Sequence, residues 1–289
     1  MTRSLLLLSM AAFAWLSLST PVFAAPNTKA PATRPVAAPT KAAPTKAKEV
    51  KPKARTKAVP KPPADSMLAN ILQSRTVRVC VRSDIPPLSY FKGETLSGFD
   101  IALAKQLVAR LSIRHRTHLR TQWIIIKASE RVPNLQKGRC DMVVAAFSRT
   151  AERAKKVAFT QVYYSTNKVV LSKKYNLSSA PVIATVRSTT QGAFSLPHAV
   201  QSSFLSYSDI LYTMRQELVD YVITDYPIGL YLARRSDNKY KIYRTLRNQE
   251  SYSVGVNLSH KHLLKELKLA LTFLKQSGQL GYIQRQWIQ

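Results

Sequence analysis

The hydrophobic pattern of residues 76–147 alternates between two periods, and this alternation constrains the fold more than any other feature of the sequence. Residues 76–82, TVRVCVR, place valine at every second position, which predicts a strand. Residues 99–111 instead predict a helix, whose apolar face is formed by Ile101, Ala104, Leu107, Val108 and Leu111. Asp100 fits the N-cap or the first turn of this helix.

The same alternation continues along the chain. Further strands are expected at residues 121–127, 141–147, 182–186 and 218–224, and further helices at 130–137, 261–276 and 279–287. Strands that alternate with helices form a parallel sheet, and ligands bind beyond the carboxyl ends of its strands. Those ends carry Arg82, Arg131 and Arg153, several hydroxyl groups and the carboxylate of Asp225. We therefore expect an α/β fold whose site suits a zwitterion with extra negative charge.

The first 24 residues predict a signal peptide. Arg3 precedes an apolar run at residues 5–18, and small residues before position 25 favour cleavage after Ala24. The chain is therefore expected in the periplasm, with an uncleaved membrane anchor as the alternative.

Residues 25–66 are expected to form a disordered linker rich in Ala, Pro and Lys. Residues 26–64 contain 10 Ala, 9 Pro and 10 Lys or Arg, with Glu49 as their single acid. Such a segment has too few large apolar side chains to offset the entropy cost of ordering. We expect an extended spacer that makes weak contact with anionic envelope surfaces.

Composition excludes several function classes. The chain carries a formal charge of +29, yet its aromatic residues are spread singly, without the interleaving of basic and aromatic residues that nucleic-acid platforms use. No partner nucleic acid is expected. The five histidines have no carboxylates at metal-ligand spacing, and the nucleotide and common hydrolase motifs do not occur. We expect no metal, no cofactor and no catalysis.

A family resemblance is carried by segments that occur in one order along the chain. They are VRVCVRSDIPPLSYFKGETLSGFDIALAKQL, ERVPNLQKGRCDMVVAAFSRTAERAKKVAFTQVYY, RSTTQ, VDYVITDYPIGLYLA and SYSVGVNLSHKHLLKELKLALTFLKQSGQLGYIQRQWI. Over residues 67–288 the chain resembles the bacterial extracellular solute-binding proteins of family 3, the amino-acid receptors of ABC transporters. The resemblance implies a two-lobed periplasmic-binding-protein-like fold of type II with a two-stranded hinge. Lobe 1 would span about 67–168 plus 254–289, and lobe 2 about 169–253.

The resemblance also implies ligand-binding roles for individual residues. Arg153 matches the arginine that forks onto the ligand α-carboxylate, a bidentate contact that lysine reproduces poorly. Asp225 matches the acid that receives the α-ammonium group from the opposite lobe. Further carboxylate contacts match Ser148, the backbone around Ala146, Thr189 and Thr190. Ser188 stands where the family usually has a glycine.

Two arginines suggest the ligand side chain. Arg131 resembles an arginine near the ligand side chain in glutamate and aspartate receptors of the family. Arg82 stands where receptors for basic amino acids tend to carry an acid. Together they would repel a cationic side chain and favour an acidic one.

The expected function is periplasmic capture of a small polar solute, with glutamate or aspartate favoured, and its delivery to the permease of an ABC transporter. Two alternatives stay open. One is a sensory or cell-wall-associated solute-binding module that serves no permease. The other is a dehydratase-like enzyme on the same fold, for which Asp225 is the clear second-lobe carboxylate.

The two cysteines are expected to be buried thiols. Cys80 lies inside the first expected strand and Cys140 at the start of the third. If these strands are adjacent and extended, the two residues are about 10 Å apart, whereas a disulfide needs Cα atoms within ~7 Å.

Overall fold

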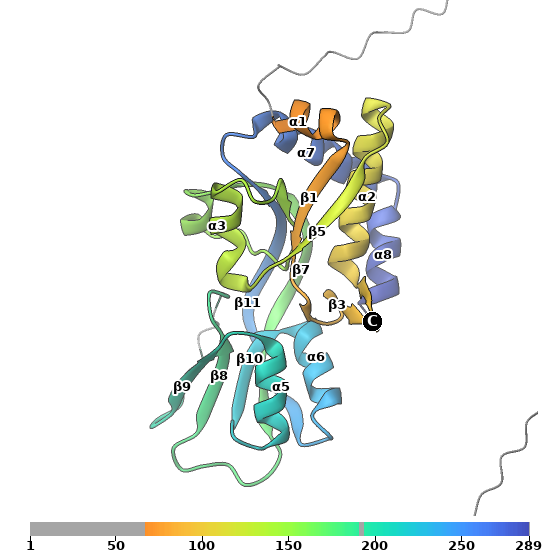
Figure 1. Ribbon diagram of the computed structural model, residues 1–289. Helices are drawn as coiled ribbons and strands as arrows, with labels where there is room; N and C mark the ends of the chain where they lie inside the picture. The colour runs from red at the N-terminus through yellow and green to blue at the C-terminus, as the bar shows by residue number, and fades with distance from the viewer. Residues whose placement is uncertain (1–66, 191–193, 289) are drawn as a thin grey trace, which may run out of the picture. The chain divides into compact units, whose positions relative to one another are not determined.

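The computed structural model describes residues 67–190 and 194–288, which form two α/β lobes joined by two long strands (Figure 1). The predicted signal peptide and linker lie outside the described residues. Within the described ranges, no helix is both long and apolar enough to cross a membrane.

The first lobe combines the N-terminal described residues with the two C-terminal helices. Its strands are β1 (Thr76–Val81), β2 (Asp84–Ile85), β3 (Ser89–Lys92), β4 (Thr95–Ser97), β5 (Arg120–Ile125) and β6 (Met142–Val143). Its helices are α1 (Met67–Ser74), α2 (Phe99–His115), the 3-10 turn η1 (Ala128–Glu130), α3 (Arg131–Gln136), α4 (Ala151–Ala154), α7 (Lys261–Gln276) and α8 (Gln279–Trp287).

The second lobe lies between the two long strands in the sequence. It contains β8 (Val182–Val186), β9 (Val200–Phe204), β10 (Tyr221–Asp225), α5 (Tyr207–Arg215) and α6 (Tyr226–Arg235). The connecting strands β7 (Ala158–Lys173) and β11 (Tyr240–Val256) pair antiparallel. They make one sheet of both lobes, in the order β5-β1-β6-β11-β7-β10-β8-β9. The predicted lobe boundaries fall in or beside these strands and remain predictions.

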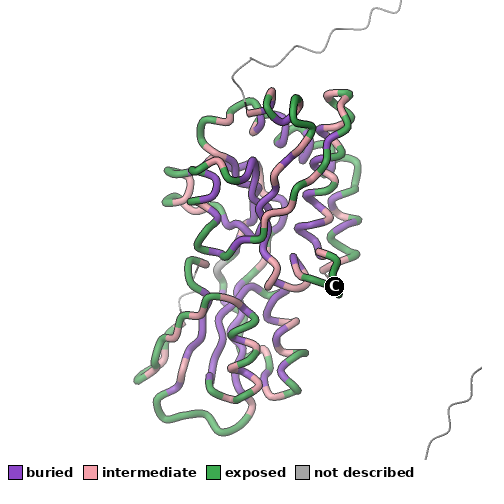
Figure 2. The backbone as a smooth tube through the Cα atoms, in the orientation of Figure 1, coloured by how far each residue is buried: buried purple, intermediate pink, exposed green. Residues whose placement is uncertain are grey.

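The alternation in β1 places its side chains on two faces of the sheet. Val77, Val79 and Val81 pack in the core cluster that contains the apolar face of α2, whereas Cys80 packs with Leu135 of α3. Helices therefore cover both faces of this part of the sheet, as expected for an α/β lobe. In Figure 2 the strands run mainly through buried backbone, while the exposed residues lie on the outer helices and loops.

Gly98 allows α2 to begin close to the loop after β2. Its φ is +123°, a conformation that side-chain-bearing residues rarely adopt, and a Cβ here would lie 2.4 Å from the Leu88 carbonyl oxygen. The helix then starts at Phe99, with Asp100 in its first turn as predicted.

The third expected strand is much shorter than predicted. Of residues 141–147, only Met142 and Val143 pair in the sheet, because the chain turns away and Ala146 adopts a φ of +46°. The strand expected at residues 218–224 begins later, at Tyr221. Helix α5 follows a capping box at Ser206 and Asp209 that the sequence analysis did not use.

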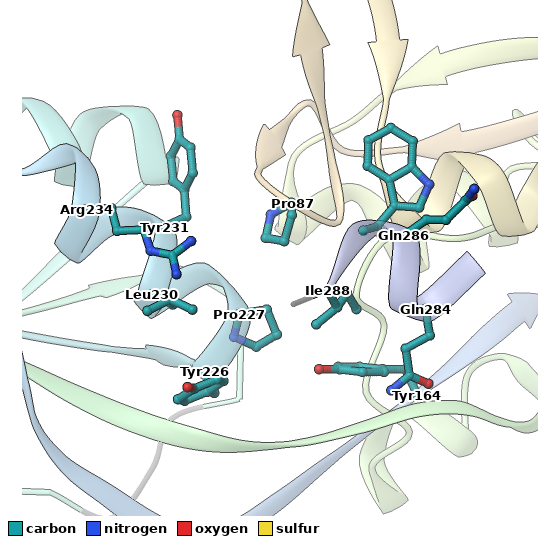
Figure 3. A pocket seen from close by; sticks show the side chains of 11 residues that line it. Pro87, Tyr164, Tyr226, Pro227, Leu230, Tyr231, Arg234, Gln284, Gln286 and Ile288 are labelled. Atoms are coloured by element: carbon teal, nitrogen blue, oxygen red, sulfur yellow. The ribbon is translucent and has the colours of Figure 1, made fainter. Parts of the chain in front are cut away.

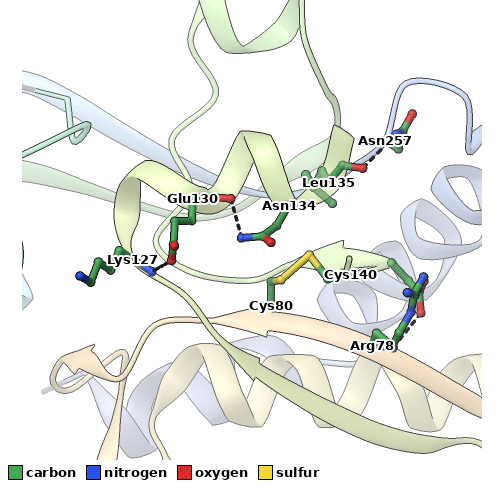
Figure 4. The surroundings of a disulfide bond; sticks show 9 residues. Arg78, Cys80, Lys127, Glu130, Asn134, Leu135, Cys140 and Asn257 are labelled. Carbon is green, nitrogen blue, oxygen red and sulfur yellow. Dashed lines mark hydrogen bonds and ion pairs between the residues drawn. A yellow bond between two sulfur atoms is a disulfide. The ribbon is translucent and has the colours of Figure 1, made fainter. Parts of the chain in front are cut away.

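The prediction of free thiols is wrong, because Cys80 and Cys140 form a disulfide (Figure 4). Their Cα atoms are 5.7 Å apart. The estimate of about 10 Å assumed that the chain before β6 continues as an extended strand. Residues 137–141 instead form a turn outside any strand, and this turn brings Cys140 over the face of β1 to which Cys80 points.

Candidate ligand-binding site between the lobes

The eight residues predicted to contact the ligand line one cavity. The first lobe contributes Arg82, Arg131, Ala146, Ser148 and Arg153, and the second contributes Thr189, Thr190 and Asp225, together with Tyr207 and Ile228. The cavity has a volume of about 10 Å³, which is room for about one water molecule. The structure thus brings the predicted residues together, and their contacts with a ligand remain a prediction.

The sheet explains why these residues converge. Arg82 directly follows β1, and Asp225 ends β10. Strand β1 is parallel to β6, and β10 is parallel to β8, so each lobe presents the carboxyl ends of two strands. Both sets of ends line the same cavity, which is where the sequence analysis expected the ligand.

Arg153 is positioned by α4, whose N-cap Thr150 accepts a hydrogen bond from the Arg153 backbone N–H. The guanidinium donates 2.8 Å hydrogen bonds from Nη1 to the Ser148 carbonyl and from Nη2 to the Ser188 carbonyl of the second lobe. Burial lowers the pKa of Arg153, while the charges of Glu250 and Asp225 act in the opposite direction. The side chain therefore bridges the two lobes.

Arg131 makes a second bridge to the same carbonyl. Its Nη2 donates to Ser188 at 2.8 Å, its Nη1 to Ala146 at 2.9 Å and its Nε to Ala128 at 2.8 Å. Burial, with the nearby positive charges of Arg153 and Arg82, lowers its pKa to about 9. Because its hydrogen bonds go to backbone carbonyls on both lobes, Arg131 supports the shape of the site more directly than it presents charge to a ligand side chain.

Arg82 is paired with an acid that the sequence analysis did not consider. Asp84 accepts a hydrogen bond of 2.8 Å from Nε and one of 2.6 Å from Nη2. The Arg82 guanidinium also lies 5.3 Å from the ring centroid of Tyr207 in the second lobe. The Tyr207 backbone N–H donates to Asp84 at 2.9 Å, so this pair is a third contact between the lobes. Asp84 compensates the charge of Arg82 locally.

Both carboxylate oxygens of Asp225 also accept hydrogen bonds from side chains of the protein. Its Oδ1 accepts a 2.8 Å hydrogen bond from Lys168 of β7, and its Oδ2 accepts one from the Tyr252 hydroxyl of β11. Lys168 lies 3.4 Å from Glu250 as well. Sequence reasoning missed Lys168, Tyr252 and Glu250, because only the pairing of β7 with β10, and of β11 with β7, brings them close to Asp225.

Asp100 fixes the cavity wall at Ala146. Its Oδ2 accepts a 2.8 Å hydrogen bond from the Ala146 backbone N–H, and its Oδ1 accepts one of 2.8 Å from Tyr163. Burial raises the pKa of Asp100 to about 6, against the lowering effect of these two hydrogen bonds. Its position in the first turn of α2 was predicted, and its role beneath the site was not.

Ser188 begins the turn that carries Thr189 and Thr190. It adopts a φ of +58°, the left-handed conformation for which the family's usual glycine is suited. Thr189 closes the turn, because its Oγ1 donates a 2.7 Å hydrogen bond to the Val186 carbonyl. The turn therefore forms without glycine and directs the Ser188 carbonyl toward the first lobe.

A larger cavity of about 400 Å³ lies elsewhere between α6, α8 and the loop before β3 (Figure 3). It is lined by aromatic and aliphatic side chains such as Tyr164, Tyr226 and Trp287, with Arg234 at one side. None of the eight predicted residues lines it. Among the residues that the structure describes, no group of three or more His, Cys, Asp or Glu side chains is placed to bind a metal.

Comparison with known proteins supports the fold and identifies the family. The model of the bacterial extracellular solute-binding proteins, family 3, matches residues 77–289. The glutamine-binding protein GlnH of an ABC transporter from Bacillus subtilis is 27% identical over 203 residues, which are 67% of this chain and 73% of that protein.

Two solved structures show the same fold. An ancestral arginine-binding protein bound to arginine has a TM-score of 0.66 and 24% identity, with 74% of this chain and 98% of that chain covered. An ancestral amino-acid-binding protein described as a precursor of cyclohexadienyl dehydratase has a TM-score of 0.66 and 24% identity, over 78% and 100% of the two chains. With the family model matching most of its length, this chain belongs to family 3 of the bacterial extracellular solute-binding proteins.

Proposed function

We propose that the protein captures a small polar solute, an amino acid, in the periplasm by closing its two lobes and delivers it to the permease of an ABC transporter. The observation that carries this proposal is that Arg153 and Asp225, from opposite lobes, line one cavity. A guanidinium suits an α-carboxylate and a carboxylate suits an α-ammonium group. A ligand that engages both would favour the closed arrangement by its differential contacts.

Loading requires the lobes to separate first. The cavity of about 10 Å³ is far too small for an amino acid. The contacts of Arg131 and Arg153 with Ser188, and of Asp84 with Tyr207, would have to break and then yield to contacts with the ligand. The glutamine-binding protein GlnH and the ancestral protein bound to arginine are named for solutes of the same class.

The proposal covers amino acids as a class. The earlier preference for glutamate or aspartate rested on Arg82 and Arg131. Arg82 is paired with Asp84, and Arg131 donates to backbone carbonyls, so neither guanidinium is reserved for a ligand side chain. Glutamate and aspartate are therefore two members of the panel that tests the function.

Binding is proposed in preference to catalysis. A dehydratase needs a general acid that faces its substrate. Asp225 already carries a hydrogen-bond donor on each oxygen, which suits an anionic acceptor better than a proton donor. Incubation with prephenate and arogenate tests this part of the proposal, since product formation would establish an enzyme.

The decisive experiment is a thermal-shift screen over the 20 common amino acids and cystine. At 100 times its dissociation constant, a ligand should stabilise the protein by about 2.7 kcal/mol. Arg153→Ala should abolish the shift. Arg149→Ala is the matched control, because Arg149 is an exposed arginine of the same segment outside the cavity lining and should leave the shift unchanged. A shift that survives in Arg153→Ala would contradict the proposed carboxylate contact.

Export and attachment are proposed from residues 1–66. Residues 1–24 would direct secretion, and residues 25–66 would form a basic tether with weak affinity for anionic envelope surfaces. Mass spectrometry of protein from the periplasmic fraction should give a chain that begins at Ala25. Intact Met1 in the membrane fraction would establish the uncleaved anchor.

A further inference from the structure

The side chain of Lys168 is buried between two carboxylates. It is 2% exposed and lies in β7, directly opposite Asp225 of the neighbouring strand β10. Its Nζ is 2.8 Å from Asp225 Oδ1 and 3.4 Å from Oε1 of Glu250, which belongs to β11. Glu250 and Asp225 are themselves 7% and 8% exposed, so all three charges interact with little screening by water.

This cluster has one cation for two anions. Lys168 makes its shorter contact with Asp225, whose second oxygen accepts the hydrogen bond of Tyr252. Within the part of the chain that the structure describes, Lys168 is the ion-pair partner recorded for Glu250. The Arg153 guanidinium acts on both carboxylates only from farther away, so one further ammonium charge would give each carboxylate its own ion-pair partner. Asp225 is the member that lines the cavity.

A ligand ammonium group would supply that charge. Both the ligand and Lys168 would then offer an ammonium group to Asp225, in a region where a second cation is repelled by the first. Lys168 has a second acceptor within 3.4 Å, so a small movement of its flexible side chain would transfer it to Glu250. The final state pairs two ammonium groups with two carboxylates.

We propose that Lys168 is an internal competitor for Asp225, and that it withdraws onto Glu250 when a ligand ammonium group binds. This inference rests on the proposed function, because it assumes that Asp225 receives that group. Lys168 is then a residue that sets the affinity for α-amino ligands. It weakens the binding of every α-amino ligand by the same displacement, and it couples ligand binding to the pair of strands that join the lobes.

The test is a double-mutant cycle with Lys168→Met and Asp225→Asn. Isothermal titration at pH 7 uses L-glutamine, L-arginine and L-cystine as probes. Lys168→Met should tighten the binding of a probe by about tenfold, the effect of one hydrogen bond to a charged group. In the Asp225→Asn background the same change should alter the affinity less than about twofold, because the competition has been removed.

Glu250→Gln and Lys173→Met complete the design. Glu250→Gln removes the negative charge that would hold the displaced Lys168 and should weaken binding, opposite in sign to Lys168→Met. Lys173→Met is the matched control, because Lys173 is a buried lysine of the same strand that pairs with Asp220, 3.3 Å away and outside the cavity lining. It should leave the affinity unchanged, whatever its effect on stability.

The outcomes distinguish failure of the proposed competition from failure of the proposed function. Binding of a probe with unchanged or weakened affinity in Lys168→Met overturns the competition and leaves the proposed function standing. An equal gain in both backgrounds also overturns it, since Lys168 would then act without Asp225. If no probe binds to wild type, Lys168→Met or Glu250→Gln, the proposed function fails and the competition fails with it. Binding by Lys168→Met alone supports the competition and contradicts capture of these probes by the wild-type protein.

Discussion

The carboxylate of Asp100 accepts a 2.8 Å hydrogen bond from the backbone N–H of Ala146, and thereby ties the start of α2 to the wall of the cavity. Ala146 holds a φ of +46°, a conformation that an alanine seldom adopts without such support. The wall of the cavity is consequently held in place by one buried acid.

Asp100 should make stability depend on pH. Its pKa is about 6 in the folded chain and 3.8 as the ordinary reference value, so the folded state binds more protons between these values. The free energy of unfolding should therefore fall as the pH rises through this window, by about 3 kcal/mol from this group. Asp100→Asn removes the contribution, so its unfolding free energy relative to wild type should rise by that amount between pH 4 and 7. Urea unfolding at several pH values measures the difference.

The variant Tyr163→Phe tests whether this pH dependence comes from Asp100. The Tyr163 hydroxyl donates to Asp100 and so lowers its pKa. Without that donor the pKa should rise further and the pH window should extend above 6. A window that moves toward lower pH in Tyr163→Phe would contradict the assignment to Asp100.

The disulfide should be a large contributor to stability. It closes a loop between residues separated by 60 positions, for which chain-entropy estimates give about 4 kcal/mol. The double variant Cys80→Ala with Cys140→Ala should lose about that much. Calorimetry with and without dithiothreitol provides the control, because reductant should lower the melting temperature of wild type and leave that of the double variant unchanged. Equal effects on both proteins would argue against the bond.

Neutralising Asp84 should release the charge of Arg82 toward the cavity. Asp84→Asn keeps an oxygen that can accept the Tyr207 N–H but removes the anion that pairs with Arg82. Binding of L-glutamate relative to L-glutamine should improve by about tenfold, as for one hydrogen bond between charged groups. Asp237→Asn, at an exposed acid outside the cavity lining, serves as the control. An unchanged ratio in titration calorimetry would show that Arg82 does not reach the ligand side chain.

A side chain at position 255 should destabilise the protein, because the ring of Phe147 lies beside Gly255. A Cβ at this position would lie 2.8 Å from Cε1 of Phe147, whose ring lies 4.9 Å from the Arg131 guanidinium and 5.3 Å from that of Arg153. Gly255→Ala should therefore cost about 1–3 kcal/mol by overpacking and weaken amino-acid binding. In the control Gly281→Ala, the Cβ meets its nearest atom at an ordinary 3.4 Å. That variant should be neutral or stabilising by up to about 1 kcal/mol in helix α8, with unchanged affinity.

The periodicity of apolar residues predicted a helix or strand well where burying one apolar face of that element is enough to determine its structure. The strand at residues 182–186 and the helices at 261–276 and 279–287 were predicted with their observed bounds. The third strand failed because a buried apolar run is compatible with irregular backbone as well as with a strand, and here the backbone turns at Ala146. The prediction of free thiols failed for a related reason, because the spacing of residues in an extended strand does not describe the turn before β6.

The grouping of the candidate residues around one cavity was predictable, whereas their partners within the protein were not. The family resemblance and the strand ends together selected eight residues that line one cavity. The partners of those residues come from contacts that no local pattern encodes, such as Lys168 opposite Asp225 through the register of β7 and β10. The pairing of Asp84 with Arg82 was easier to predict, because the two residues are only two positions apart. Even here, only the turn into β2 brings the carboxylate back to the guanidinium.

The Ser188 carbonyl oxygen is a hydrogen-bond acceptor that the protein itself supplies to both bridging arginines. It accepts from Arg131 and from Arg153, so the main chain already fills the place that a carboxylate would take. Under the proposed function, capture would exchange one oxygen for another, and the affinity would report the difference between them. A neutral solute gains little by such an exchange, because it replaces one uncharged acceptor with another, whereas an anionic group gains the full strength of the charged contact.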